Sequence, residues 1–271
     1  MPIPIYQVDA FTRVPFKGNP AGVCLLDQPE SVEWMQAMAA EMNLSETAFL
    51  LPEGDLEEDS CQNCYRLRWF TPKVEVKLCG HATLASAHIL WQTGLLPSSE
   101  TARFLTRSGE LTARKRGDWI ELNFPARPAA EAQAPEGMIE SLGVEPLFVG
   151  KANEDYLVEV ASEAEVRRAA PDFAALKSAQ ARGIILTSKA DSVQLDFVSR
   201  FFAPAVGINE DPVTGSSHTT LVPYWSHKLG KTEMAAHQAS ARGGDLRLRL
   251  EGERVIIGGQ AVTIFSGQIP A

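Results

Sequence analysis

The stretch Arg68-Trp69-Phe70-Thr71-Pro72 recurs about half a chain later as Arg200-Phe201-Phe202-Ala203-Pro204. Each copy is followed two residues later by a valine, and then by a loop of small residues that opens a helix-like segment. A motif repeated at this spacing indicates an internal duplication. We therefore expect two similar domains, residues 1–125 and 126–271, with the boundary in the Pro-, Ala- and Glu-rich stretch 125–135 and a last strand able to return to the first half.

Strand-like patterns dominate both halves. Short runs of apolar and β-branched residues predict strands over 5–11, 21–26, 47–51, 65–70, 119–124, 156–160, 183–187, 195–202, 246–250 and 255–265. Helical spacing predicts fewer helices, over 32–42 with Ser31 as N-cap, 82–91, 135–142, 164–169 and 216–227. Because hairpin-like strands outnumber crossover helices, we expect an α+β fold with a mostly antiparallel sheet.

Composition excludes several classes of partner. The 25 Lys and Arg residues against 34 Asp and Glu give a net charge of -9, and the densest basic run, 114–116, is typical of a hairpin tip. We therefore expect no nucleic-acid partner. The start of the chain lacks signal-peptide features and no apolar stretch reaches bilayer length, so we expect a cytoplasmic protein without membrane segments.

Metal and cofactor motifs are weak or missing. Cys61 and Cys64 form a CxxC pair, and Cys79 and His81 are the only tempting further zinc ligands, so we expect no metal. The sequence contains no GxGxxG, GxxxxGK[ST], HExxH or GxSxG motif. These observations favour chemistry carried out by side chains alone, without a cofactor.

Glycine begins a helix-like segment in each half, at Gly80 within 78–84 and at Gly215 within 210–218. A helix N-terminus presents unpaired N–H groups and a positive dipole end, and glycine lets a ligand approach the backbone. Two such ends facing each other would hold a carboxylate. For either glycine alone a tight strand-to-helix turn is the better explanation; the repetition of the loop, with ionisable residues in both copies, favours binding.

Three ionisable residues are candidates for catalysis. Period-two alternation puts Glu46 on the same strand face as Ala48 and Leu50, where burial would raise its pKa towards neutrality and suit it to general acid/base work. His81 is placed to donate to substrate or to orient that carboxylate. The alternatives are an exposed glutamate at a strand start, a structural histidine and, for Asp211, a loop cap. Cys79 is a lone thiol, because the second repeat offers Asp211 or Pro212 at the matching place, which disfavours a two-cysteine racemase.

Taken together, these motifs resemble the phenazine-biosynthesis isomerase family, a branch of the diaminopimelate-epimerase-like fold. The resemblance rests on residues 16–23, 45–49, 68–72 with 79–85, and 200–204 with 210–216, in the family's order and extending to 223–225. It implies two similar domains related by pseudo-twofold symmetry, each a curved, mostly antiparallel, barrel-like sheet around a central helix. It also implies a site in the cleft between them, a homodimer, and no metal or organic cofactor.

The same resemblance implies roles for individual residues. Glu46 would be the acid/base of a proton-transfer isomerase acting on a small, carboxylate-bearing substrate, with His81 and Asp211 as polar catalytic partners. Asn19, Gly80, Gly215 and Ser216 would bind the substrate. Ser217 stands where the family commonly has alanine, which would add a hydroxyl near the cleft. Two alternatives remain: an amino-acid racemase or epimerase, and a non-catalytic binding protein that keeps the family cleft.

Overall fold

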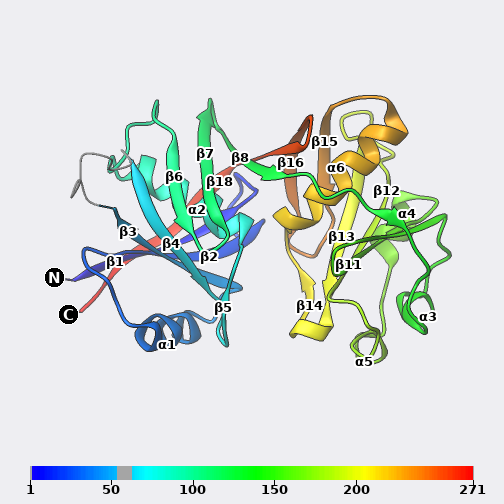
Figure 1. Cartoon of the computed structure of the whole chain (residues 1–271), viewed down its shortest axis with the longest axis horizontal. Coiled ribbons are helices and arrows are strands. Elements are labelled where there is room, and N and C mark those ends of the chain that lie inside the picture. Colours follow the sequence, from blue (N-terminus) through cyan, green and yellow to red (C-terminus); the bar gives the residue numbers. More distant parts are fainter. Residues whose placement is uncertain (1, 54–62, 271) are drawn as a thin grey trace. The chain divides into compact units, whose positions relative to one another are not determined.

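The computed structural model describes residues 2–53 and 63–270 and divides the chain into two compact units (Figure 1). Unit 1 comprises residues 1–123 and 258–271, and unit 2 comprises residues 124–257. The fold is a mixed α/β fold with few helices, in which most strand pairs are antiparallel, as the sequence predicts. No helix among the described residues is both long enough and apolar enough to span a membrane.

Unit 1 is a sheet with a helix on each of its faces. Its elements are β1 (Ile3–Ala10), β2 (Asn19–Leu25), α1 (Val32–Met42), β3 (Glu46–Pro52), β4 (Cys64–Phe70), β5 (Glu75–Val76), α2 (Gly80–Gln92), β6 (Ala102–Thr106), β7 (Gly109–Arg116), β8 (Trp119–Pro125) and β18 (Ala261–Ile269). Strand β1 pairs with β18 and β2, β3 with β4, β4 with β5, and β6 with β7, all antiparallel. Two pairs are parallel, β2 with β3 and β4 with β6, because α1 and α2 carry the chain across the sheet.

Unit 2 repeats this order of strand pairing. Its elements are β9 (Ala130–Glu131), α3 (Met138–Leu142), β10 (Phe148–Ala152), β11 (Asp155–Glu159), α4 (Glu163–Arg168), α5 (Phe173–Leu176), β12 (Gly183–Lys189), β13 (Phe197–Ala203), η1 (Pro204–Val206), β14 (Ile208–Asp211), α6 (Gly215–Leu229), β15 (Glu233–Gln238), β16 (Gly244–Glu251) and β17 (Arg254–Gly259). Strands β10 to β16 pair in the pattern of β1 to β7, with β11–β12 and β13–β15 parallel. The repeated motif therefore marks equivalent strands, β4 and β13.

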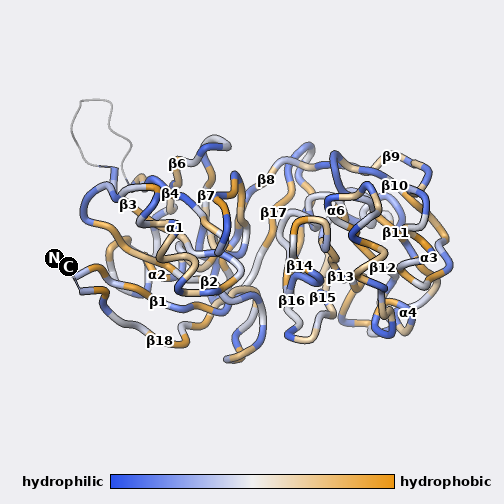
Figure 2. Tube along the Cα trace, turned by 90° about the horizontal axis from the view of Figure 1, so that it is seen from below, coloured by the Kyte–Doolittle hydropathy of each residue, from blue (hydrophilic) through white to orange (hydrophobic). Residues whose placement is uncertain are grey.

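The two faces of the unit 1 sheet bury different side chains. On one face Phe49 and Phe70 pack edge-to-face, and Trp34 of α1 packs against Phe49. The other face carries α2, whose residues from His81 to Trp91 are nearly all buried. Small residues such as Ala82 and Ala85 let this helix lie close to the sheet. Hydrophobic stretches run along the strands of both units in Figure 2, mixed with hydrophilic ones, and strands such as β2 and β3 are buried over most of their length.

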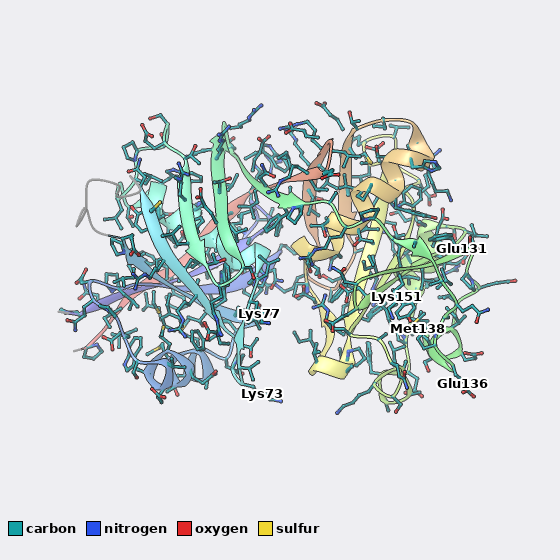
Figure 3. The ribbon with its side chains drawn as sticks, viewed as in Figure 1. Lys73, Lys77, Glu131, Glu136, Met138 and Lys151 are labelled. Atoms are coloured by element: carbon teal, nitrogen blue, oxygen red, sulfur yellow. The ribbon has the colours of Figure 1, made fainter. Side chains whose placement is uncertain are left out.

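The core of unit 2 is built in the same way. A cluster of buried residues includes Val158, Leu186 and Phe202 of the sheet and Met138 of α3. Figure 3 labels Met138 beside the preceding Glu136, which is exposed. Helix α6, like α2, is largely buried, with Trp225 stacked on Phe197.

The arginine of each repeated motif anchors the short strand that follows. Arg68 donates to both carboxylate oxygens of Glu75 at 2.8 and 2.9 Å and lies 5.2 Å from the centre of the Phe70 ring. Arg200 donates to both carboxylate oxygens of Glu210 at 2.6 and 2.9 Å. A bidentate pair fixes geometry as well as charge. The two arginines are therefore structural, joining β5 to β4 and β14 to β13 just before each glycine-led helix.

We expect Arg200→Gln to lower the free energy of unfolding by about 2 kcal/mol and Arg68→Gln by at most about 1 kcal/mol. The Arg200 side chain is 11% exposed and also donates to the carbonyls of Val166 and Ala169 at the end of α4, whereas the Arg68 side chain is 32% exposed. Urea unfolding of both variants checks this. Equal losses of unfolding free energy in the two variants would show that the hydrogen bonds from Arg200 to the end of α4 add nothing to stability.

Two local predictions need correction. The strand predicted over 255–265 is interrupted at Gln260, whose carbonyl accepts a hydrogen bond from Thr12, so β17 and β18 are separate strands. Helix α3 begins at Met138 rather than at Pro135. Strands such as β6, β7 and β15 were not predicted, because their exposed charged residues hide the apolar alternation.

Candidate active site

Glu46 is the first residue of β3, placed by its parallel register against Ala21 of β2. Alternation along the strand puts its side chain on the face of Ala48 and Leu50, opposite to that of Phe49. This is the face that α2 covers, and the Glu46 side chain is only 14% exposed. The prediction that Glu46 lies on the strand face of Ala48 and Leu50 and is largely buried is therefore confirmed, whereas the predicted rise of its pKa stays a prediction.

His81, the second residue of α2, lies against this carboxylate. Its Nε2 is 3.2 Å from Oε2 of Glu46, and its side chain is 6% exposed. The amide Nδ2 of Asn19, at the start of β2, lies 3.2 Å from Nδ1 of His81. Because this amide group donates to Nδ1, the proton of the neutral ring sits on Nε2 and points at Glu46. Burial lowers the pKa of His81 to about 3, so the ring stays neutral at ordinary pH.

Cys79 packs on the same imidazole. Its Sγ lies 3.5 Å from Nδ1 and 3.9 Å from Nε2 of His81, so the sulfur lies against the ring face rather than along either in-plane lone pair. Single donor atoms of Glu46, Cys79 and His81 all lie within 4.8 Å of one another, and they are the group that could hold a metal ion. A metal would need an in-plane nitrogen lone pair, yet both ring nitrogens face Asn19 and Glu46. The arrangement fits an acid/base pair better than a metal centre. Cys61, half of the CxxC pair, lies outside the described residues.

The predicted unit 2 residues lie together on the loop that opens α6. Asp211 ends β14 and accepts a hydrogen bond from the hydroxyl of Thr214, the N-cap residue, while Gly215 and Ser216 form the first turn. Gln238 of β15 holds this loop: its amide donates to the Asp211 carbonyl and accepts from the Thr214 N–H, each at 2.8 Å. Gln238 was not predicted, and nothing in its local sequence marks it. Ser217 donates to the Thr214 carbonyl at 2.8 Å, so its hydroxyl stabilises the helix start.

Equivalent positions in the two units carry different chemistry. The N-cap residue Cys79 of α2 corresponds to Thr214 of α6, which corrects the expectation that Asp211 or Pro212 occupies the matching place. Strand register makes Gly183 of β12 the counterpart of Glu46. A Cβ at Gly183 would lie 2.3 Å from the ring of Phe201, so no larger side chain fits there without displacing this ring. At this position of the duplicated strands, unit 1 therefore carries a carboxylate side chain and unit 2 carries a glycine.

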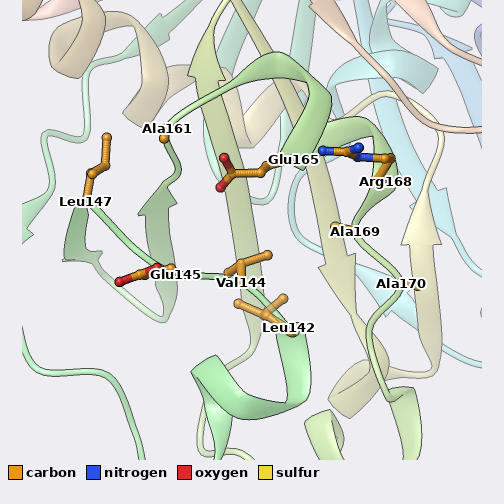
Figure 4. Close-up of a pocket in the computed structure, with 10 residues that line it drawn as sticks. Leu142, Val144, Glu145, Leu147, Ala161, Glu165, Arg168, Ala169 and Ala170 are labelled. Carbon is orange, nitrogen blue, oxygen red and sulfur yellow. The ribbon is translucent and has the colours of Figure 1, made fainter.

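A separate hollow of about 560 Å³ lies in unit 2 beside α3 and α4 (Figure 4). Its lining includes Leu142, Val144 and Leu147, with Glu165 and Arg168 of α4 at the polar end. None of the predicted site residues lines it. We therefore place the candidate active site at the Glu46–His81–Asn19 group and not in this hollow.

Known proteins resemble this chain over nearly its whole length. A family model described as phenazine biosynthesis-like protein matches residues 8–267. An uncharacterized isomerase of Halalkalibacterium halodurans is 53% identical over 270 residues, covering 99% of both chains. The crystal structure of a phenazine biosynthesis protein family member from Enterococcus faecalis has a TM-score of 0.93 and 40% identity over 100% of both chains.

A more distant structure shares the fold alone. A hydroxyproline epimerase from Agrobacterium vitis has a TM-score of 0.62 at 12% identity, covering 99% of this chain and 92% of the epimerase. The family model spans nearly the whole chain, and several close relatives carry the name isomerase. The chain therefore belongs to the phenazine biosynthesis-like protein family and is an enzyme of the isomerase type.

Proposed function

We propose that this enzyme is a cofactor-independent isomerase in which Glu46 moves a proton between two positions of a small, carboxylate-bearing substrate. The observation that carries the proposal is the series of close contacts from Asn19 to His81 to Glu46: the Asn19 amide lies 3.2 Å from Nδ1 of His81, and Nε2 of His81 lies 3.2 Å from the Glu46 carboxylate. Asn19 sets the tautomer of His81, and the Nε2–H of His81 orients the carboxylate. A neutral histidine in this position fixes Glu46 without competing for the proton that Glu46 must take and return.

The reaction needs no redox partner. The Glu46 carboxylate takes a proton from a carbon whose C–H bond is acidified by conjugation, and the electron pair of that bond delocalises over the substrate. The resulting carboxylic acid then returns the proton to a different carbon, so the substrate is isomerised and Glu46 is regenerated. Holding the substrate rigidly against a preorganised acid/base provides much of the rate in such reactions.

The starts of α2 and α6 are the segments that we propose bind the substrate's negative charge. Among the described residues, neither N-cap side chain, that of Cys79 or that of Thr214, caps its helix, whereas Ser31 of α1 and Ser162 of α4 do so. First-turn N–H groups without a side-chain cap suit an anionic ligand. This supports Gly80 as a binding position beside His81.

The remaining predicted features are proposals of the same kind. Asp211, Gly215 and Ser216 stay predicted catalytic or substrate-binding residues, supported by their shared place at the uncapped start of α6. A pseudo-twofold relation between the domains, supported by the repeated strand pairing, belongs to the proposal, as do the homodimer and the cytoplasmic location.

A deuterium-exchange screen tests the proposed function. The wild-type enzyme is incubated in heavy water with a panel of amino acids and dihydroaromatic carboxylates, and each compound is analysed by mass spectrometry. Incorporation of deuterium that disappears in Glu46→Gln supports the proposal and names the substrate class. Incorporation that persists unchanged in Glu46→Gln would assign proton transfer to another residue.

Cys79→Ser is expected to retain activity within a few fold of wild type. The sulfur lies on the face of the His81 ring, and the residue at the equivalent position of the repeat is Thr214, not a second thiol. Removing a genuine acid/base group costs about 100-fold or more. The rate of deuterium exchange measures the difference, and a loss of that size in Cys79→Ser, with exchange into an amino-acid α-carbon, would favour a thiol-based epimerase instead.

A further inference from the structure

The indole N–H of Trp69 is a buried donor that has no acceptor among the described residues. Trp69 is 1% exposed, and its Nε1 makes no hydrogen bond to any residue in the described part of the chain. Two other buried indoles are paired: Nε1 of Trp91 donates to the Glu100 carbonyl at 3.2 Å and that of Trp225 to the Thr187 hydroxyl at 3.1 Å. Because buried N–H groups are almost always satisfied, an orphaned one needs an explanation.

Strand register places Trp69 on the face of the sheet that carries Glu46. Trp69 of β4 lies directly opposite Ala48 of β3, and directly opposed residues of antiparallel strands project to the same side. Ala48 shares its face with Glu46, two residues earlier along β3. The other face is occupied by the Phe49 and Phe70 rings. The indole therefore lies on the α2 side of the sheet, as Glu46 does.

The repeat shows how far an aromatic ring at this motif position reaches. In unit 2 the equivalent residue is Phe201, and its ring Cζ lies 2.3 Å from the position of a Cβ at Gly183. Gly183 is the counterpart of Glu46 in strand register. An aromatic side chain at this position can thus extend to the first residue of the neighbouring strand. Phenylalanine has no donor, whereas the unit that carries Glu46 and His81 has an indole N–H.

We propose that Trp69 is a substrate-binding residue whose Nε1–H donates a hydrogen bond to a substrate oxygen, either of the carboxylate or of a carbonyl conjugated to the reacting carbon. The inference rests on the proposed function, which puts such an oxygen beside Glu46. An indole N–H is neutral and does not titrate, so it stabilises negative charge developing on that oxygen without exchanging protons with Glu46. Bound substrate would supply an acceptor to this N–H, which has none among the described residues.

Nuclear magnetic resonance of ¹⁵N-labelled indoles tests the free state. The chain has five tryptophans, and the Trp69 signal is identified by its loss in Trp69→Phe. In the free protein we expect the Trp69 Nε1–H proton to resonate upfield of those of Trp91 and Trp225, which have acceptors. Saturation with anthranilate, a small aromatic carboxylate, should move the Trp69 signal downfield and leave the Trp225 signal in place. A Trp69 signal that is already downfield in the free protein would overturn the inference.

Anthranilate affinity separates this inference from the proposed function. We expect Trp69→Phe to weaken binding about tenfold, and the matched control Trp225→Phe to leave it unchanged. If anthranilate shifts the His81 ring signals but binds wild type and Trp69→Phe equally, with the Trp69 signal unmoved, Trp69 is not a binding residue and the proposed site stands. If neither anthranilate nor the other carboxylates of the panel shift the His81 signals, the proposed site and this inference both fail. If Trp69→Phe folds poorly, the Trp69 signal in the wild-type spectrum is identified by elimination, as the one that persists in Trp34→Phe, Trp91→Phe, Trp119→Phe and Trp225→Phe.

Discussion

Replacing Glu46 with glutamine is expected to lower the turnover rate by about 10²- to 10⁴-fold, the range typical of an essential general acid/base. Glutamine keeps the size of the side chain and a carbonyl oxygen that still accepts the Nε2–H of His81, but it cannot take up a proton near neutral pH. The expected loss is therefore one of chemistry and not of folding. Single-turnover deuterium incorporation into the identified substrate measures it.

Glu121→Gln is the matched control for this variant. Glu121 lies in the same unit, its side chain is 18% exposed, and it pairs with Arg116 at the hairpin of β7 and β8. We expect its exchange rate to stay near that of wild type. Circular dichroism and urea unfolding should show both variants folded. Wild-type turnover in Glu46→Gln would contradict the central assignment.

Acidification is expected to destabilise the protein through its buried histidines. Burial lowers the pKa of His81 to about 3 and that of His218 to about 4, from 6.5. Below pH 6.5 the unfolded chain binds protons that the folded protein does not, so the free energy of unfolding falls as pH falls from about 6.5 towards these folded-state values. Between pH 7.5 and pH 5.5 each histidine should cost about 1.4 kcal/mol, or about 3 kcal/mol together.

Urea unfolding at the two pH values checks this expectation. His218 is the sharper probe, because its ring donates to the Thr214 carbonyl and stacks on Phe197, whereas His81 has the Glu46 carboxylate beside it. We expect His218→Gln to remove about half of the pH dependence. Burial also lowers the pKa of His88, which adds a contribution in the same direction. Equal stability at pH 7.5 and pH 5.5 would show that these rings are protonated in the folded state.

Local sequence signals were reliable where they depended on residues close in the chain. The cap at Ser31 and the helix over 32–42 were predicted with their observed bounds, because N-cap chemistry and helical spacing are properties of a single turn. The hairpin turn before Trp119 followed from a charged run that precedes a predicted strand. Period-two alternation alone predicted the strand face on which Glu46 lies. The repeated loops predicted the two helices that begin at Gly80 and Gly215.

Contacts between distant segments could not be predicted in this way. Asn19 fixes the tautomer of a histidine 62 residues away, and Gln238 holds a loop more than twenty residues before it. Neither Asn19 nor Gln238 lies in a recognisable sequence pattern, because one polar residue at the end of a strand cannot be told from another by sequence. Likewise, nothing in the sequence marks Thr214 as the counterpart of Cys79, because the loops before the two helices differ in length. The observed helix starts show that the two residues are equivalent N-cap residues.

A repeated motif, strand-rich patterning and an ionisable group near each of two glycine-led helix starts can be recognised from the amino-acid sequence alone, because they depend on short stretches of chain. Which side chains meet at the equivalent positions of the two halves is seen only in the folded chain. Glu46 meets His81 and Asn19 in unit 1, while the ring of Phe201 occupies the matching space at Gly183 in unit 2. Such differences depend on which side chains close packing brings within hydrogen-bond distance, and packing is a property of the folded chain alone.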